Sequence, residues 1–405
     1  MSTLRDVEIH QPRTLPGQAR LQSLDILRGL VMVIMALDHI RDFFHAGAMH
    51  FSPEDLTQTS VLLFFTRWIT HFCAPVFVFL AGTSAYLAMR RKDPSTVSRF
   101  LLTRGVWLVI VETTLVHLGI FFNLSYTYML WQVIWAIGWS MIALSVLRKL
   151  PWAVLLTISI ATIAGHNMLD GLQPEQFGSL GWLWSILHAS FFTMQLSEGH
   201  SALVAYALIP WVAVMSAGYC FGRVMDAGAK RRRLLFVIGS TLTTGFLLLR
   251  GIDAYGDPSP WTSQASPVMT MLSFLRVTKY PPSLDFLLMT LGPAMLALGA
   301  LDKVSVSVRN PLLVFGRVPL FYYIGHWYVI HTIALVLAWA RYGRFDFIFD
   351  VPPSLPISVG YPTDYGYDLW VVYVIWATIV FAMYFACRWF AGVKARNRSP
   401  LLGYL

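Results

Sequence analysis

The chain has 405 residues, of which 56% are hydrophobic and only 13% are charged, and its formal net charge is +9. Soluble domains carry about 25% charged residues, so this composition excludes a water-soluble globular protein and is typical of a polytopic membrane protein. The surplus of Lys and Arg is then a topology signal and does not indicate a nucleic-acid partner. Cys73, Cys220 and Cys387 each lie in an apolar run, so no disulfide framework is expected.

Runs of about 20 apolar residues predict an all-α integral membrane protein with about ten transmembrane helices. In chain order the runs are 24–44, 61–89, 100–122, 127–147, 151–169, 202–221, 234–250, 284–301, 318–340 and 369–391. Cytoplasmic loops retain Lys and Arg, and most of these residues share one side of the membrane if both termini are cytoplasmic. We therefore expect a cytoplasmic tail over 1–20 without a cleaved signal peptide, a transmembrane domain over 21–391 and a cytoplasmic tail over 392–405.

Three loops on the expected outer side, 45–60, 165–201 and 251–283, are longer than simple connections and are candidates to carry function. The second contains the short apolar stretch 182–188, which predicts a re-entrant or interfacial helix as an alternative to a full span. Most of the 11 histidines also fall toward this side. They indicate either proton-transfer chemistry there or neutral polar residues in loops that lack Lys and Arg.

The first apolar run carries two residues that an ordinary membrane anchor does not have, Arg28 and His39. Their separation corresponds to three helical turns plus roughly 20°, so both project from one face, about 16 Å apart along the axis. Ionisable side chains at membrane depth usually mark a working site. Arg28 is expected near the cytoplasmic side and His39 toward the outer side. An i,i+3 pair between Arg28 and Asp25 that merely anchors the helix is the alternative.

Several segments together resemble the bacterial DUF1624 proteins, which are grouped with the catalytic domain of heparan-α-glucosaminide N-acetyltransferase. They are 20–29 (RLQSLDILRG), 35–44 (MALDHIRDFF), 70–82 (THFCAPVFVFLAG), 209–211 (IPW), 278–284 (TKYPPSL) and 315–326 (FGRVPLFYYIGH). The similarity runs from about Arg20 to about Phe390. It implies a multi-pass protein of the bacterial inner membrane that moves an acyl group, by expectation acetyl, from cytoplasmic acyl-CoA to a hydroxyl or amine of an extracytoplasmic glycan or similar acceptor.

The resemblance suggests roles for a set of residues. The candidate general base is His39, and the superfamily's Arg, ten residues, then His pattern on the first helix matches Arg28 and His39. His45 and His50 in the following loop are the alternative bases. Asp38 is adjacent to His39, whereas Asp42 lies one turn on and is better placed to orient its imidazole. Candidates for stabilising the tetrahedral oxyanion are Lys279 and His71. Candidates for binding acyl-CoA are Arg28, Arg309, Arg317 and His326.

Other interpretations remain open at this point. Arg309 and Arg317 can serve as topology determinants only. A transporter of a small polar solute would have a similar helix count, but no paired halves or paired broken helices are visible in the sequence. A catalytically inactive scaffold on the same fold is a third class. A metal site is not expected, because no HxxxH pair or Cys/His spacing occurs. The expected surroundings are the lipid bilayer, and a homodimer is left open.

Overall fold

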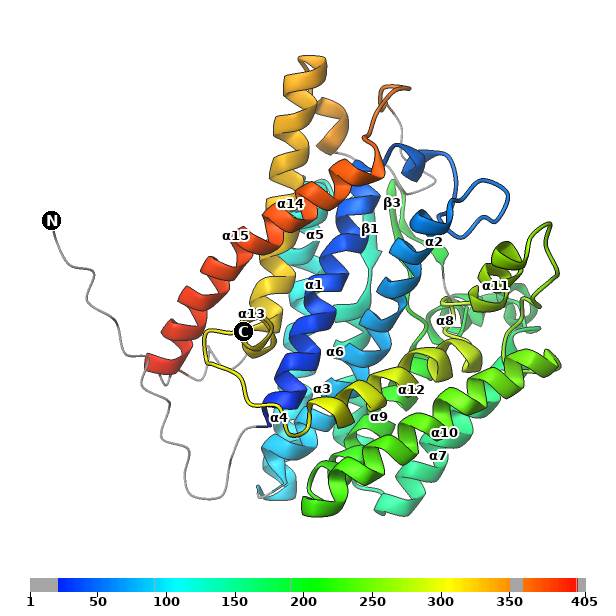
Figure 1. Ribbon diagram of the computed structural model, residues 1–405, viewed down its shortest axis with the longest axis vertical. Coiled ribbons are helices and arrows are strands. Elements are labelled where there is room, and N and C mark those ends of the chain that lie inside the picture. Colours follow the sequence, from blue (N-terminus) through cyan, green and yellow to red (C-terminus); the bar gives the residue numbers. More distant parts are fainter. Residues whose placement is uncertain (1–20, 91, 190, 350–359, 398, 400–405) are drawn as a thin grey trace, which may run out of the picture.

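The computed structural model describes residues 21–90, 92–189, 191–349, 360–397 and 399. The expected N-terminal tail and half of the expected C-terminal tail therefore lie outside the described residues. Helices dominate the rest (Figure 1). They are α1 Gln22–Phe44, α2 Val61–Trp68, α3 Cys73–Met89, α4 Pro94–Val111, α5 His117–Phe121, α6 Val133–Leu147, α7 Trp152–Gly165, α8 Gly181–Leu187, α9 Leu208–Met225, α10 Arg231–Ile252, α11 Pro267–Leu275, α12 Leu284–Leu301, α13 Pro311–Arg317, α14 Pro319–Tyr342 and α15 Leu369–Arg396.

Eight helical stretches of the described chain are long and apolar enough to cross a membrane. They are Val61–Ala88, Pro94–Phe121, Trp152–Leu169, Leu208–Met225, Gly228–Ile252, Leu284–Leu301, Pro319–Tyr342 and Leu369–Arg396. Two of the ten predicted spans are not among them. α6 has only 15 residues, and α1 has 23 residues but carries several charged side chains. The prediction of a mostly helical, multi-pass architecture is confirmed at this level.

A small sheet departs from the all-α expectation. β1 (Tyr128–Trp131) pairs in parallel with β3 (His200–Val204), which pairs antiparallel with β2 (Phe192–Ser197). The predicted spans 127–147 and 202–221 therefore each begin in a strand, and their helices start later. A short apolar run does not distinguish a buried strand from a helix, which explains the error. The expectation of a short helix near 182–188 agrees with α8.

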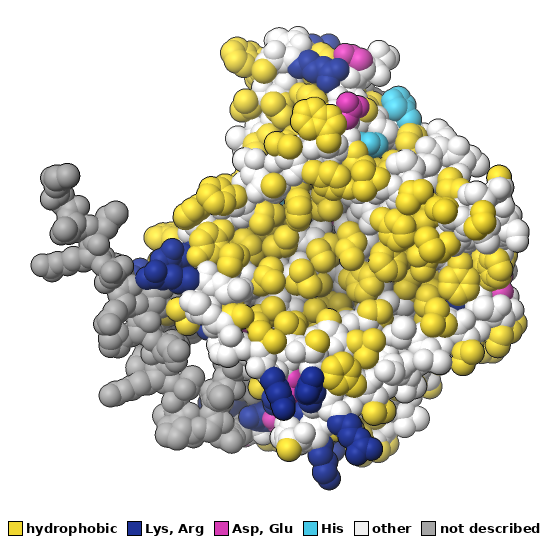
Figure 2. All heavy atoms as spheres, viewed as in Figure 1, with side chains coloured by type: hydrophobic (Ala, Val, Ile, Leu, Met, Phe, Trp, Pro, Cys, Tyr) yellow, Lys and Arg dark blue, Asp and Glu magenta, His cyan; other side chains and the backbone are white. Residues whose placement is uncertain are grey.

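The surface has the layering of a membrane protein. Figure 2 shows a broad band of hydrophobic side chains across the middle of the molecule, with Lys and Arg gathered mainly at the end where α1 begins. Large apolar side chains are exposed along the long helices, including Leu248 on α10 and Phe381 on α15. Exposed apolar surface of this extent is typical of helices that contact lipid. The cytoplasmic orientation of the basic end stays a prediction.

α1 lies at the centre of the helix assembly, between α3, α13, α14 and α15 (Figure 1). Its contact with α13 depends on two glycines. A Cβ at Gly29 would lie 1.8 Å from the Leu312 carbonyl oxygen, and a Cβ at Gly316 would lie 1.8 Å from the Asp25 carbonyl oxygen. Only residues without a side chain let two helix backbones approach so closely. This contact fixes the position of α1 and of the functional candidates that it carries.

Candidate functional site

A polar cavity of about 470 Å³ opens at the C-terminal end of α1. We call it the upper cavity, after its place in the view of Figure 1. Residues from α1, the loop after it, α2, β1, the segment before α9, the loop before α12 and α14 line it. Among them are the candidates Asp38, His39, Asp42, His45, His50 and Lys279. The structure thus brings together both candidate bases on the first helix and in its loop, as well as one candidate oxyanion stabiliser.

Arg67, near the end of α2, organises the charges of the upper cavity. Its guanidinium donates two hydrogen bonds to Asp38, at 2.9 and 2.7 Å, and contacts Glu54 at 3.4 Å. Arg41 lies 2.9 Å from the same Asp38 carboxylate and 2.6 Å from Asp42. Asp38 is therefore paired with two guanidinium groups, which makes it a structural anion and a poor candidate for a base.

His39 is held by aromatic packing. Its ring centroid lies 4.0 Å from that of Trp327 and 5.3 Å from that of His326, both on α14. Among the described residues no side chain hydrogen-bonds to the His39 ring. Asp42 was expected to orient this imidazole, but it pairs with Arg41 instead, because the guanidinium of the adjacent residue lies within reach. A ring held by packing keeps its nitrogens available to a ligand in the cavity.

His45, the first residue after α1, is the alternative base. Its Nδ1 accepts a hydrogen bond from the Gly47 backbone N–H at 3.2 Å. Burial and the nearby Arg41 lower the pKa of His45, although Asp368 opposes this shift. His45 is consequently neutral near pH 7, and its one proton-accepting nitrogen is Nδ1, which already accepts from Gly47.

The two candidates for oxyanion stabilisation differ in position. Lys279 lines the upper cavity, is 8% exposed, and holds its Nζ 5.1 Å from the centroid of the Tyr280 ring. His71 is fully buried outside the cavity lining and lies 3.2 Å from Glu54 Oε1. Burial by itself raises the pKa of Glu54, but His71 and Arg67 outweigh it and lower the pKa to about 2. Lys279 can therefore contact a ligand directly, whereas His71 pairs with Glu54.

A second cavity, of about 280 Å³, lies near the N-terminal end of α1 and is called the lower cavity. Arg28 and Arg104 contribute its cations, and most of its other lining is apolar. The Arg28 guanidinium donates hydrogen bonds to Asp25 at 3.0 Å, to the Gly316 carbonyl at 3.0 Å and to Ser84 Oγ at 2.7 Å. The expected Arg28–Asp25 pair is present, and the same arginine also faces the cavity.

The other acyl-CoA candidates do not line the lower cavity. Arg309 is exposed in the segment between α12 and α13, and Arg317 is half-buried at the end of α13. His326 is fully buried and packs against His39 at the upper cavity. The grouping of these three residues with Arg28 is thus not observed. Pro319, Leu320 and Tyr323, at the start of α14, line the lower cavity with Arg28 instead.

A narrow layer of polar side chains separates the two cavities. Gln132 lines the upper cavity and Tyr323 lines the lower one. The Tyr323 hydroxyl donates to Gln132 Oε1 at 3.4 Å, and the Gln132 backbone N–H donates to Glu112 Oε1 at 2.8 Å. Glu112 begins a π-helical turn, Glu112–Val116, and such turns occur frequently at functional sites. The two cavities are therefore neighbours that share α1 and α14.

The family model described as heparan-alpha-glucosaminide N-acetyltransferase, catalytic, matches residues 20–252. The match covers more than half of the chain. The chain belongs to this family. The resemblance inferred from the sequence motifs is thereby confirmed. No curated protein matches the chain in sequence.

The range matched by the heparan-alpha-glucosaminide N-acetyltransferase family model includes Arg28 and His39, which share one face of α1. Lys279 and Trp327 lie beyond the matched range, although they complete the upper cavity. Arg67 was not identified from the sequence as the residue that pairs with both Asp38 and Glu54. Its signal was available, because an arginine within the apolar run 61–89 is the kind of intramembrane charge that marks a site.

Proposed function

We propose that this protein transfers an acetyl or other acyl group from acyl-CoA, bound at the lower cavity, to a hydroxyl or amine of a glycan or similar acceptor in the upper cavity. The observation that carries the proposal is the pair of cavities at opposite ends of one face of α1. Arg28 and His39 are about 16 Å apart along the helix axis, and the layer that contains Gln132 and Tyr323 lies between the two cavities, each residue lining one of them. An acyl group can therefore reach an acceptor on the far side of this layer while the nucleotide stays on the near side.

The acyl donor would bind through its phosphates and its apolar arm. Arg28 and Arg104 offer guanidinium groups, which suit phosphate oxygens. The apolar lining, with Met32, Phe77 and Leu320 among its members, suits the pantetheine chain. The charge and shape of the lower cavity both support an acyl-CoA, with the thioester directed toward Tyr323.

The acceptor would react in the upper cavity. A hydroxyl or amine attacks the thioester carbonyl once His39 takes its proton, and general-base catalysis of this kind contributes about 10²–10⁴-fold. The tetrahedral oxyanion is stabilised by the Lys279 ammonium. Collapse of the intermediate then breaks the C–S bond, releases CoA as the thiolate and leaves the acyl group on the acceptor. Arg67 and Arg41 keep Asp38 ionised and paired, so His39 is the unpaired base.

The family and the apolar band support a membrane setting, and we propose that this is the bacterial inner membrane, with both termini in the cytoplasm. Acyl-CoA is then drawn from the cytoplasm, and the glycan is modified on the other side. This orientation follows from the concentration of Lys and Arg near the start of α1 (Figure 2). Cysteine accessibility of Ala48→Cys and Arg91→Cys in intact cells tests it, and labelling of both positions from the same side would overturn it.

The direct test uses purified protein in lipid nanodiscs with radiolabelled acetyl-CoA and a panel of amino-sugar and neutral oligosaccharide acceptors. His39→Gln is expected to lower the rate of transfer by about 10²–10⁴-fold without abolishing acetyl-CoA binding. His200→Gln is the matched control, because His200 is exposed in the β2–β3 hairpin. Loss of transfer in His45→Gln, but not in His39→Gln, would overturn the assignment of the base.

Acetyl-CoA binding is tested separately. Arg28→Gln is expected to weaken binding by about 10-fold or more, since hydrogen bonds to charged groups contribute about 1.5–3 kcal/mol. Arg309→Gln is the control, because Arg309 is exposed and does not line the lower cavity. Absence of both saturable binding and His39-dependent transfer or hydrolysis would refute the enzyme and favour a scaffold.

A further inference from the structure

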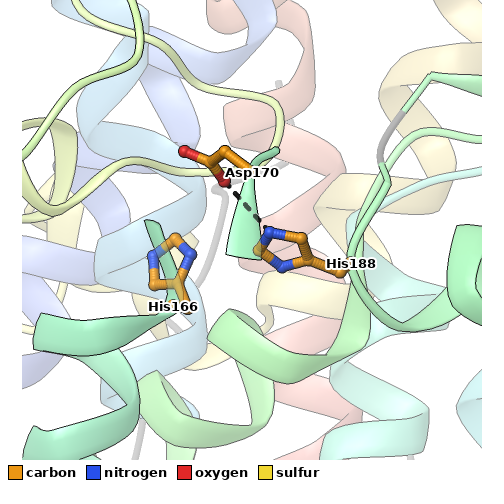
Figure 3. Close-up of side chains that lie close together, drawn as sticks. All are labelled: His166, Asp170 and His188. Atoms are coloured by element: carbon orange, nitrogen blue, oxygen red, sulfur yellow. Dashed lines mark hydrogen bonds and ion pairs between the residues drawn. The ribbon is translucent and has the colours of Figure 1, made fainter. Parts of the chain in front are cut away.

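Three side chains outside both cavities form a compact group at the end of α7. They are His166 and Asp170, on the short helical turn η4 (His166–Leu169) and directly after it, and His188, which follows α8. One ligand atom of each lies within 4.8 Å of the other two, and His188 Nε2 lies 3.0 Å from Asp170 Oδ1. Figure 3 shows the two imidazoles and the carboxylate around a common space, with the His188–Asp170 contact dashed.

The histidines of this group are buried and incompletely satisfied. His166 and His188 are each 2% exposed. The Pro282 carbonyl lies near the His166 ring, but within the described residues neither of its ring nitrogens forms a hydrogen bond of normal geometry. A buried polar atom without a partner costs about 1–3 kcal/mol. A cation bound between the two rings and the carboxylate would satisfy one of the two His166 nitrogens.

The carboxylate is oriented by a second layer of contacts. Asn167 Nδ2 donates to Asp170 Oδ2 at 2.8 Å, which leaves Oδ1 directed toward His188. Hydrogen bonds of this kind to a ligating group are typical of metal sites. Asn167 Oδ1 in turn accepts from the Leu284 backbone N–H at 2.9 Å, at the first residue of α12. The group is thus connected to the loop that carries Lys279.

We propose that His166, Asp170 and His188 form a binding site for one Zn²⁺ ion. Two imidazoles and one carboxylate are a ligand set that zinc accepts, with a water molecule in the fourth position. Ligand atoms around zinc at bond lengths of about 2.0–2.1 Å lie roughly 3.4 Å apart, so the observed spacing closes to this geometry with side-chain movements of about 1 Å. Neutral imidazoles and an ionised carboxylate are the forms that bind the ion.

The ion would link several segments at the upper end of the molecule. It would join the end of α7 to the end of α8 and, through Asn167, to the start of α12. The loop between α11 and α12 supplies Lys279 and Tyr280 to the upper cavity. Zinc binding is therefore expected to stabilise this loop. The proposal does not depend on acyl transfer, because its evidence is the ligand group itself.

The test measures zinc directly on full-length protein without a histidine tag, stripped with a chelator, reloaded with ZnCl₂ and desalted in nanodiscs. Wild-type protein and the control His200→Gln are expected to retain about one zinc per chain, and His166→Gln or Asp170→Asn about a tenth of that or less. Cobalt substitution gives a second readout, because tetrahedral Co²⁺ shows visible d–d absorption that the variants should lose.

A melting experiment on wild-type protein tests the proposal even if the variants do not fold. Wild-type protein alone is expected to melt at a higher temperature with ZnCl₂ than after chelation, because a ligand that binds the native state stabilises it. The proposal is overturned if reloaded wild-type protein holds no stoichiometric zinc, or if folded His166→Gln retains as much as the control. In those cases the group is a structural His188–Asp170 hydrogen bond beside a buried imidazole.

Discussion

Replacing Arg67 with methionine keeps the bulk of the side chain but leaves the charges around it without their common partner. Arg67 is 13% exposed and holds Asp38, which is 11% exposed, through contacts of 2.7 and 2.9 Å. Breaking a buried ion pair costs about 3–5 kcal/mol, because one charge stays buried without compensation. After the substitution, Asp38 still has Arg41 as a partner at 2.9 Å, and Glu54 still has His71 at 3.2 Å. We therefore expect a loss near the lower limit, about 3 kcal/mol.

A double-mutant cycle separates this effect from lost packing. Arg67→Met combined with Asp38→Asn removes both charges, so the double variant is expected to be more stable than Arg67→Met alone, with a coupling energy of about 2 kcal/mol. The control is Arg341→Met, whose exposed pair with Asp364 contributes about 0–1 kcal/mol. Unfolding in mixed SDS micelles measures each free energy. Equal stabilities of Arg67→Met and the double variant would refute the reasoning.

Three further outcomes are expected. Gly29→Ala places a Cβ 1.8 Å from the Leu312 carbonyl oxygen and should lower the melting temperature strongly. Gly245→Ala is the control, because the nearest atom to its Cβ would be 3.8 Å away. Equal melting temperatures of the two variants would contradict the packing argument. The pKa of Glu54 is lowered from 4.5 to about 2, so its stabilisation is complete above pH 4.5 and is lost as the pH falls through 2. Between pH 4.5 and pH 2, the free energy of unfolding of the wild type should thus fall more steeply than that of Glu54→Gln. Parallel curves for the two proteins would show that Glu54 does not contribute this stabilisation. Tyr323→Phe should change the rate of acetyl transfer more than the Kd of acetyl-CoA in the nanodisc assay, because the Tyr323 hydroxyl contacts Gln132 between the two cavities. An effect on the Kd alone would contradict a role of this contact in transfer.

The shared face of Arg28 and His39 on α1 was predictable because it depends on one helix alone. The period of 3.6 residues places Arg28 and His39 on one face, and each residue lines one of the two cavities. The partners of these residues were not predictable in the same way. Trp327 packs on His39, and Gly316 accepts from Arg28 over a sequence separation of 288 residues. Such contacts arise from tertiary packing and have no local pattern.

Other features escaped because their local pattern was ambiguous or was not sought. The strands β1 and β3 lie inside apolar runs that equally suit helices. A search for His pairs at i,i+4 passes over His166 and Asp170, which have the same spacing but mixed ligand types. The position of Asp42 next to Arg41 also shows that helical spacing fixes the face of a side chain, while the nearest opposite charge decides its hydrogen bond.

The composition of α1 has a consequence for how the protein is made. The helix carries Asp25, Arg28, Asp38, Arg41 and Asp42, and it does not qualify as an apolar span on its own. A single Arg or Asp at a helix centre disfavours insertion by about 2.5–3.5 kcal/mol. Some of these charges pair within α1 itself, as Arg28 does with Asp25 and Arg41 with Asp38 and Asp42. Further partners come from segments synthesised later, namely Arg67 on α2, Ser84 on α3 and Gly316 on α13. We therefore expect the nascent α1 to be retained by the insertion machinery until those helices arrive, so that helices translated later complete the membrane integration of the first.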